Sequence, residues 1–267
     1  MSTRLVLFRV FLLSMVLSVV VSRPVWAIEQ QLPVDLSGLN NDLTTALIRT
    51  VALGADHRAY MPATPMGLAI GLDAGVDFTA VAVPKEFASA LALSTGKAES
   101  TLPTVIPVPK LSLHKGFPGG FDLGFSYATS KMLLGQEDLF NVFGFDLKWA
   151  FIDGGNVKPA VAARFSYSKS KLWFMSTNTF SIDAVASKNL YVIDPYVGAG
   201  LKIWSGDLAI PVGVPGLPLT VSGSQSSMNP HVFAGLPFKM MLLRLTVEVD
   251  YNLAGMTSYG GKFSFNF

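Results

Sequence analysis

Composition and charge narrow the class of protein at once. The chain has 267 residues, of which 50% are hydrophobic and only 14% are charged. A soluble domain carries about 25% charged residues, so this composition excludes a disordered chain and is untypical of a cytosolic enzyme. Cysteine is absent, which excludes disulfide scaffolds, thiolate metal sites and cysteine nucleophiles. Three of the 20 basic residues lie in the first 27 positions, and the remaining 17 nearly balance the 18 acids. We therefore expect no nucleic-acid partner.

Residues 1–27 form a predicted secretory signal peptide. Arg4 and Arg9 precede an uncharged apolar run from Val10 to Val21, which is too short to span a bilayer as a stable helix. Pro24 ends the run, and Val25-Trp26-Ala27 offers a cleavage site after the alanine. A retained signal anchor is the alternative. The pattern predicts export of the mature chain.

Residues 28–65 differ in character from the rest. Leu39, Leu43, Ala46, Leu47 and Thr50 share one face of a predicted short helix over residues 39–53. Three arrangements remain open for this segment: a periplasmic extension packed on the rim of the following domain, a plug that enters its interior, or a helix that binds a partner.

From residue 66 onward the hydrophobicity alternates with period two. Large apolar residues occupy every second position in residues 121–127, 143–151, 243–251 and 263–267, so each strand has one apolar and one polar face. The segments run about 10 to 14 residues, close to what a tilted membrane strand needs. Their apolar faces are rich in aromatic residues, and their polar faces hold glycine, serine and charges. This favours a membrane barrel with lipid outside over a soluble sandwich or lipocalin-like barrel.

The pattern predicts an all-β fold, a closed antiparallel transmembrane β-barrel of about ten strands, with eight or twelve also possible. We expect strands at residues 66–83, 106–116, 120–130, 140–152, 158–171, 178–187, 190–204, 228–236, 240–251 and 257–267. Tight turns at 117–119, 153–156, 188–189 and 237–239 are expected on the periplasmic side, and long loops near 84–105 and 205–227 outside. The first long loop also predicts a short helix at residues 84–93.

The C-terminal residues carry a resemblance. Phe263, Phe265 and Phe267 alternate with Lys262, Ser264 and Asn266 up to the chain end. This ending resembles the last strand of Gram-negative outer-membrane β-barrel proteins, which the barrel-assembly machinery recognises. The resemblance covers the architecture of residues 66–267 and matches no specific characterised member. It implies a small single-chain barrel in the cell outer membrane, with the three phenylalanines as an assembly signal, and with lipid, lipopolysaccharide and the assembly machinery as partners.

Strand parity also predicts which charges point into the lumen. Seven acids and five bases share the inward parity: Asp73, Asp77, Asp122, Asp146, Lys148, Arg164, Asp194, Lys202, Arg244, Glu248, Asp250 and Lys262. Opposite charges at close range in a wall of low dielectric constant should pair. About ten strands leave an interior barely wide enough for side chains. These charged residues are therefore either the polar core of the barrel or the lining of a narrow conducting path.

A catalytic site is not expected. Of the three histidines, His57 precedes the predicted barrel and His114 lies near the periplasmic end of its strand. His231 is placed within possible reach of Glu248, the one candidate pair for acid–base chemistry. The sequence shows no metal-ligand spacing, phosphate-binding loop or serine elbow. We expect no enzyme activity, no cofactor and no metal.

Outward-facing aromatic residues predict the two interfaces of the membrane. Phe121, Trp149 and Phe151 should lie near the periplasmic interface. The outer interface is assigned Trp173, Trp204 and Tyr251. Alternation further predicts that arginine is tolerated better at the inward position 246 than at the outward position 247.

The sequence favours passive transport or binding of small, or hydrophobic, solutes through a narrow polar lumen. The apolar stretch 209–219, expected in a loop, suits a hydrophobic solute. Pro107, Pro109 and Pro195 interrupt strand donors and are either a lateral gap or tolerated kinks. The alternative function is a non-conducting structural or surface-interaction barrel of the adhesin kind. The oligomeric state stays open.

Overall fold

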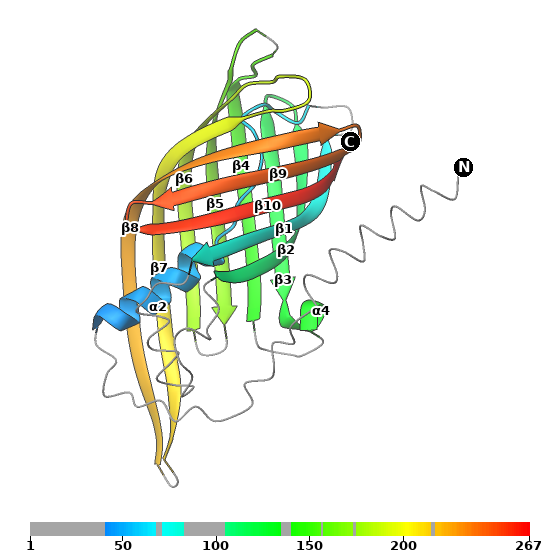
Figure 1. Cartoon of the computed structure of the whole chain (residues 1–267). Coiled ribbons are helices and arrows are strands. Elements are labelled where there is room, and N and C mark those ends of the chain that lie inside the picture. Colours follow the sequence, from blue (N-terminus) through cyan, green and yellow to red (C-terminus); the bar gives the residue numbers. More distant parts are fainter. Residues whose placement is uncertain are drawn as a thin grey trace. The chain divides into compact units, whose positions relative to one another are not determined.

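Ten antiparallel strands form a closed barrel in the computed structural model (Figure 1), which describes residues 41–67, 71–82, 105–134, 140–155, 157–172, 175–214 and 217–267. Each strand pairs with its neighbour along the chain, and β1 closes the barrel against β10. The strands are β1 (Leu72–Ala82), β2 (Val105–Phe117), β3 (Phe121–Thr129), β4 (Phe140–Ile152), β5 (Ala160–Leu172), β6 (Met175–Ser187), β7 (Tyr196–Val214), β8 (Leu217–Met240), β9 (Leu243–Asn252) and β10 (Met256–Asn266). The described residues also form helices α2 (Asn41–Gly54) and α4 (Ser130–Leu134). The predicted class and strand number are confirmed.

Some predictions fall on residues outside the described ranges. They are the signal peptide at 1–27, the first part of the 28–65 segment, the helix at 84–93 and Trp173.

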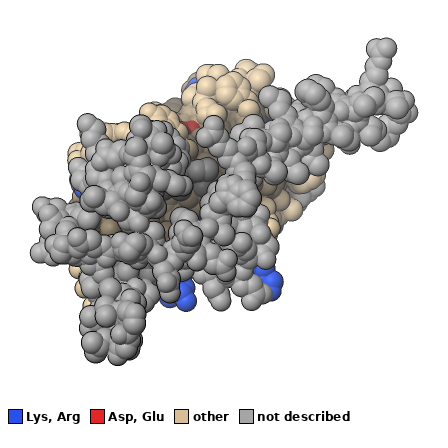
Figure 2. Space-filling model, turned by 60° about the horizontal axis from the view of Figure 1, so that its bottom comes forward, with Lys and Arg blue, Asp and Glu red and all other residues tan. Residues whose placement is uncertain are grey.

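The two faces of the barrel wall are opposite in chemistry. Apolar side chains lie exposed on the outside, among them Phe125, Tyr127, Phe143, Leu147, Trp149, Phe151, Ile182, Ile203, Val247 and Tyr251. Charged side chains lie buried inside, the reverse of a soluble protein. The described surface in Figure 2 is mainly uncharged, with Lys and Arg in small areas. The exterior is therefore the lipid-facing side of a membrane barrel.

The β7–β8 hairpin is longer than predicted. The sequence predicts a long loop at 205–227, but β7 and β8 stay paired from Tyr196 opposite Gly235 to Val214 opposite Leu217. The prediction is wrong because glycine, serine and proline disguise the alternation there. The tight turn expected at 237–239 is also displaced, since β8 continues to Met240 and the turn is formed by residues 241–242.

Two further boundaries differ from the prediction. β1 begins at Leu72 rather than at residue 66, and β7 begins at Tyr196 rather than at residue 190. Residues 188–195 form a longer connection, in which Leu190 bridges Ile193. The lateral gap considered at Pro107 and Pro109 is not present in the pairing of β1 with β2. The two prolines oppose Ala80 and Phe78 in a continuous register. Pro195 precedes its strand.

The barrel has two distinguishable ends. The base carries residues 118–120, 153–155, 157–159, 188–195 and 241–242, together with the start of β1 and the end of β10. The mouth carries α4, the turn 253–255, the end of β7 and the start of β8. In Figure 1 the mouth faces down and to the left, and α2 lies at this end of the barrel. Neither of the described helices is long and apolar enough to cross a membrane.

Candidate functional site: the filled lumen

The described part of the N-terminal segment lies inside the barrel. Residues later in this segment contact β6 closer to the base of the barrel. The carbonyl oxygen of Ala52 accepts a hydrogen bond from Thr179 Oγ1 at 3.0 Å, and Thr64 Oγ1 lies 3.2 Å from Ser187 Oγ. Because β6 begins at the mouth with Met175 and ends at the base, residues 44–67 run down the lumen. We call these residues the lumen segment.

Helix α2 fills the mouth side of the lumen. Its buried residues Ile48, Ala52 and Leu53 pack in one cluster with Met175, Trp204, Leu208 and Met256 from the wall. The prediction that Trp204 belongs to the outer aromatic girdle is wrong, because its side chain is only 1% exposed. Trp204 has the same parity as Lys202 and therefore points inward, where its indole nitrogen donates to Asn229 Oδ1 at 2.8 Å.

Glycines on the wall make room for the lumen segment. A β-carbon on Gly144 would lie 2.4 Å from the Cβ of His57, far inside normal contact. On Gly260 it would lie 2.2 Å from the Tyr60 hydroxyl oxygen. Because the wall is recessed where the segment carries its larger side chains, the two surfaces are complementary in shape.

All twelve charged side chains assigned to the lumen by parity are buried. Most of them form ion pairs with nitrogen–oxygen distances of 2.7 to 3.6 Å: Lys148–Asp122, Lys262–Asp73, Arg244–Asp73, Lys202–Asp250, Arg164–Asp183 and Lys239–Asp194. Asp77 accepts instead from Ser112 Oγ at 2.7 Å, and Glu248 accepts from the Tyr196 hydroxyl at 2.5 Å. The interior is thus a network of paired charges.

Sequence reasoning missed several members of this network. Asp183 and Lys110 lie on β6 and β2 with inward parity, so alternation offered a signal for both. Asp56, His57 and Arg58 lie on the lumen segment, where no strand pattern applies. Their place in the network arises only from the tertiary fold.

Asp56 joins the lumen segment to the wall. Its carboxylate accepts from Lys202 Nζ at 2.6 Å and from Arg58 Nε at 3.0 Å. The Lys110 ammonium donates a hydrogen bond to the backbone carbonyl oxygen of Asp56. On the other side of Lys202, Asp250 Oδ2 lies at 2.9 Å. One wall lysine therefore links a carboxylate of the segment to a carboxylate of the barrel.

Lys148 fixes the segment nearer the base. Its ammonium donates to the carbonyl oxygens of Pro62 at 2.7 Å and Thr64 at 2.9 Å. A buried backbone carbonyl needs a donor, and here the donor is a side chain of the barrel wall.

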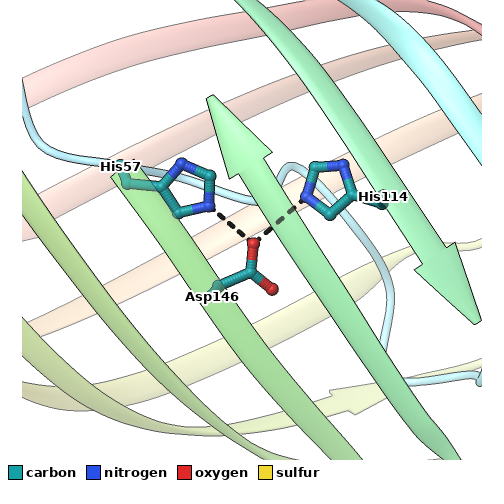
Figure 3. Close-up of side chains that lie close together, drawn as sticks. All are labelled: His57, His114 and Asp146. Carbon is teal, nitrogen blue, oxygen red and sulfur yellow. Dashed lines mark hydrogen bonds and ion pairs between the residues drawn. The ribbon is translucent and has the colours of Figure 1, made fainter. Parts of the chain in front are cut away.

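His57, His114 and Asp146 meet inside the lumen (Figure 3). Asp146 Oδ1 lies 2.6 Å from His57 Nε2 and 3.2 Å from His114 Nε2. Ser126 Oγ lies 2.6 Å from His57 Nδ1, and Lys262 Nζ lies 2.9 Å from His114 Nδ1. His57, expected before the barrel, is thus inside it.

The same three residues are candidate metal ligands, since their ligand atoms all lie within 4.8 Å of one another. The hydrogen bonds argue otherwise. A lysine ammonium has only donors, so His114 Nδ1 must accept and its Nε2 must carry the proton that points at Asp146. To bind a metal through Nε2, His114 would need a free lone pair on that nitrogen in place of the proton. The geometry fits two imidazoles that are hydrogen-bonded to one carboxylate oxygen.

His231 has other partners than the one expected. Its Nδ1 lies 3.0 Å from Asp250 Oδ2 and its Nε2 lies 2.9 Å from Asp183 Oδ1. The expected pairing with Glu248 is wrong because the β8–β9 register places Asn252 opposite His231.

A closed antiparallel barrel with an aromatic exterior and a charged interior is a transmembrane barrel of the outer-membrane type. No protein-family model matches the chain, and no curated protein matches it.

The chain is similar to several solved outer-membrane barrels. One is the N-terminal barrel domain of Pseudomonas aeruginosa OprF, at 16% identity and a TM-score of 0.33, covering 72% of this chain and 97% of that one. A second is the KdgM porin in complex with disordered oligogalacturonate, at 11% identity and a TM-score of 0.37, covering 73% and 99%. A third is Neisserial surface protein A, at 10% identity and a TM-score of 0.27, covering 73% and 97%.

Proposed function

We propose that this chain is a plugged outer-membrane barrel. It is closed while the lumen segment fills it, and it admits small polar solutes when that segment leaves. One observation carries the proposal: the interior is filled by a separate stretch of chain and not by strand side chains alone. The surrounding wall is charged, so it suits water and polar solutes better than hydrophobic ones.

The closed state rests on contacts at three depths. At the mouth, Ile48 packs in the cluster around Trp204. Midway, the Tyr60 hydroxyl lies 2.8 Å from Thr79 Oγ1 on the wall. At the base, Ala63 is wholly buried among Ala150, Ala160, Ala162 and Val185. A solute would have to displace all three layers.

The segment is held differently from a strand of the barrel. Among the described residues, it is attached by side-chain contacts and by wall donors to single carbonyls, and it is absent from the strand ladders. Such attachments can be exchanged for water one at a time, whereas a closed ladder cannot open without unfolding the barrel. This supports displacement of the segment within an intact barrel.

Orientation and partners belong to the same proposal. We place the base in the periplasm, because short turns and both ends of the sheet face that side in outer-membrane barrels. Phe263, Phe265 and Phe267 are exposed on the outer face near the base, where lipid and the barrel-assembly machinery can reach them. Lipopolysaccharide would then surround the mouth.

A permanently closed structural barrel is the second candidate. The ion pair of Asp56 with Lys202, and the close packing of His57 against Gly144, hold the segment in the lumen as a permanent core would be held. If these contacts never release, the protein stabilises the membrane or presents its loops and conducts nothing.

A reversible cross-link separates the two candidates. A β-carbon on Gly223 would lie 2.9 Å from Thr44 Cγ2, so a cysteine sulfur in the place of that Cγ2 would lie beside a cysteine at position 223. The chain has no cysteine of its own, so Thr44→Cys with Gly223→Cys gives one defined bond from α2 to β8. Single-channel conductance is recorded from the refolded protein in a planar bilayer, with Gly223→Cys alone as control.

The plugged-channel proposal predicts silence in the oxidised form. After reduction, discrete conductance steps should appear under high voltage or low urea, as in the control. Failure to re-form the cross-link under these conditions shows that α2 has moved away from β8. If the reduced form and the control still show no conductance, the segment has left the lumen without opening a conducting path. That result contradicts conduction and favours the structural barrel.

A further inference from the structure

We propose that α2 begins at the cell surface, so that the chain passes from outside to inside through its own lumen before it forms β1. The two ends of the described chain, Asn41 and Phe267, then lie on opposite sides of the outer membrane. The threading is argued from contacts inside the barrel. Its relation to the cell rests on the orientation given under the proposed function.

The wall strand β4 gives the direction of the lumen segment independently of β6. β4 runs from the mouth at Phe140 to the base at Ile152. Three successive points of the segment lie against it at increasing residue number: Ala55 packs in one cluster with Val142, His57 Nε2 contacts Asp146, and the carbonyl of Pro62 accepts from Lys148. The segment therefore descends steadily and does not fold back on itself.

The lower end of the segment joins the barrel at the base. The backbone nitrogen of Met66 donates to the carboxylate of Asp122, at the start of β3, at 3.2 Å. A β-carbon on Gly116, at the end of β2, would lie 2.6 Å from the carbonyl oxygen of Gly67. Leu72 then begins β1, bonded to Phe267. The chain thus enters the sheet where it leaves the lumen.

The upper end of the segment lies at the mouth. Thr44, in the first turn of α2, lies beside Gly223, where an added β-carbon would be 2.9 Å from Thr44 Cγ2. Gly223 opposes Leu208. Leu208 in turn opposes Met175, the first residue of β6. Arg49 reaches the turn between β9 and β10, where its Nη1 donates to the carbonyl of Ala254 at 3.4 Å. The first turn of α2 is therefore level with the rim, and the helix runs inward from there.

This path makes the N-terminal end of α2 part of the surface that a partner outside the cell can reach, together with the mouth loops. Insertion in the opposite direction, from the periplasm, would place residue 41 near the base. The contacts of Thr44 and Arg49 exclude that arrangement for the folded protein.

Single-cysteine labelling in intact cells tests the inference, because the chain supplies no background thiol. The test variant is Asn41→Cys. Two control variants calibrate the sides: Leu253→Cys at the mouth, 56% exposed, and Met241→Cys at the base, fully exposed. A membrane-impermeant maleimide is applied before and after the outer membrane is permeabilised.

We expect Asn41→Cys and Leu253→Cys to be labelled in intact cells and Met241→Cys only after permeabilisation. If Asn41→Cys behaves like Met241→Cys, the threading is overturned. If Met241→Cys is labelled in intact cells and the other two are not, the orientation in the proposed function is wrong, while the threading stands.

A second variant keeps the test decisive if the thiol at position 41 does not react. A specific protease site inserted directly before Asn41 should be cut in intact cells by added protease. Cutting only after permeabilisation overturns the inference.

Discussion

Replacing Lys202 with methionine removes one cation from between two buried carboxylates. Lys202 Nζ lies 2.6 Å from Asp56 Oδ2 on the lumen segment and 2.9 Å from Asp250 Oδ2 on β9. Each side chain is at most 4% exposed. Breaking a buried ion pair from one side costs about 3–5 kcal/mol, because the remaining charge is left uncompensated. We expect the Lys202→Met variant to lose that much unfolding free energy.

A double-mutant cycle isolates the part that involves the lumen segment. Equilibrium unfolding in denaturant is followed by tryptophan fluorescence for Lys202→Met, Asp56→Asn and the double variant. His231, whose Nδ1 lies 3.0 Å from Asp250 Oδ2, is left unchanged in all of them. The double variant should lose less than the sum of the single losses, with a coupling above about 1 kcal/mol, as expected for residues in contact. Additive losses, or a loss below about 1 kcal/mol for Lys202→Met, would refute the placement of Asp56 against the wall.

Three further predictions follow from single positions. Val247→Arg on the lipid face should lower the unfolding free energy by about 2–4 kcal/mol if it lies near the midplane. The control Met241→Arg, at a fully exposed position in a turn, should change it by less than about 0.5 kcal/mol. Equal losses in a denaturant titration would contradict the assigned faces. Gly144→Ala should cost about 1–3 kcal/mol by overpacking, because its new β-carbon would lie 2.4 Å from that of His57, and an unchanged denaturation midpoint would argue against the filled lumen. Phe267→Ala should reduce the amount of folded protein in the outer membrane, measured by heat-modifiable gel mobility, without slowing refolding in detergent; normal assembly in cells would remove its role as a signal.

The barrel could be predicted because alternation reports directly on the two faces of a strand. In residues 143–151 every second residue is large and apolar, and Phe143, Leu147 and Trp149 are indeed exposed. The rule failed where side chains are small, in the β7–β8 hairpin. Thr246 is wholly buried in the filled lumen, so we expect arginine there to cost more than parity alone predicts.

The lumen segment shows what a single sequence does not contain. The apolar face of α2 predicts that something buries it, but not what. Asp56 and Lys202 are 146 residues apart in sequence, and no local pattern links them. The segment's fit depends on glycines such as Gly144, whose absent side chains gave no signal in the alternation.

The most direct test of the filled lumen is disulfide formation in isolated outer membranes without denaturant. The pair Thr44→Cys with Gly223→Cys is compared with Thr44→Cys with Met241→Cys, which joins mouth to base. Our account predicts that mild oxidation links the first pair almost completely and the second pair not at all, as read by mass spectrometry of the cross-linked peptides. Failure of the first pair to form, or equal yields from both, would contradict a lumen occupied by the chain's own N-terminal segment.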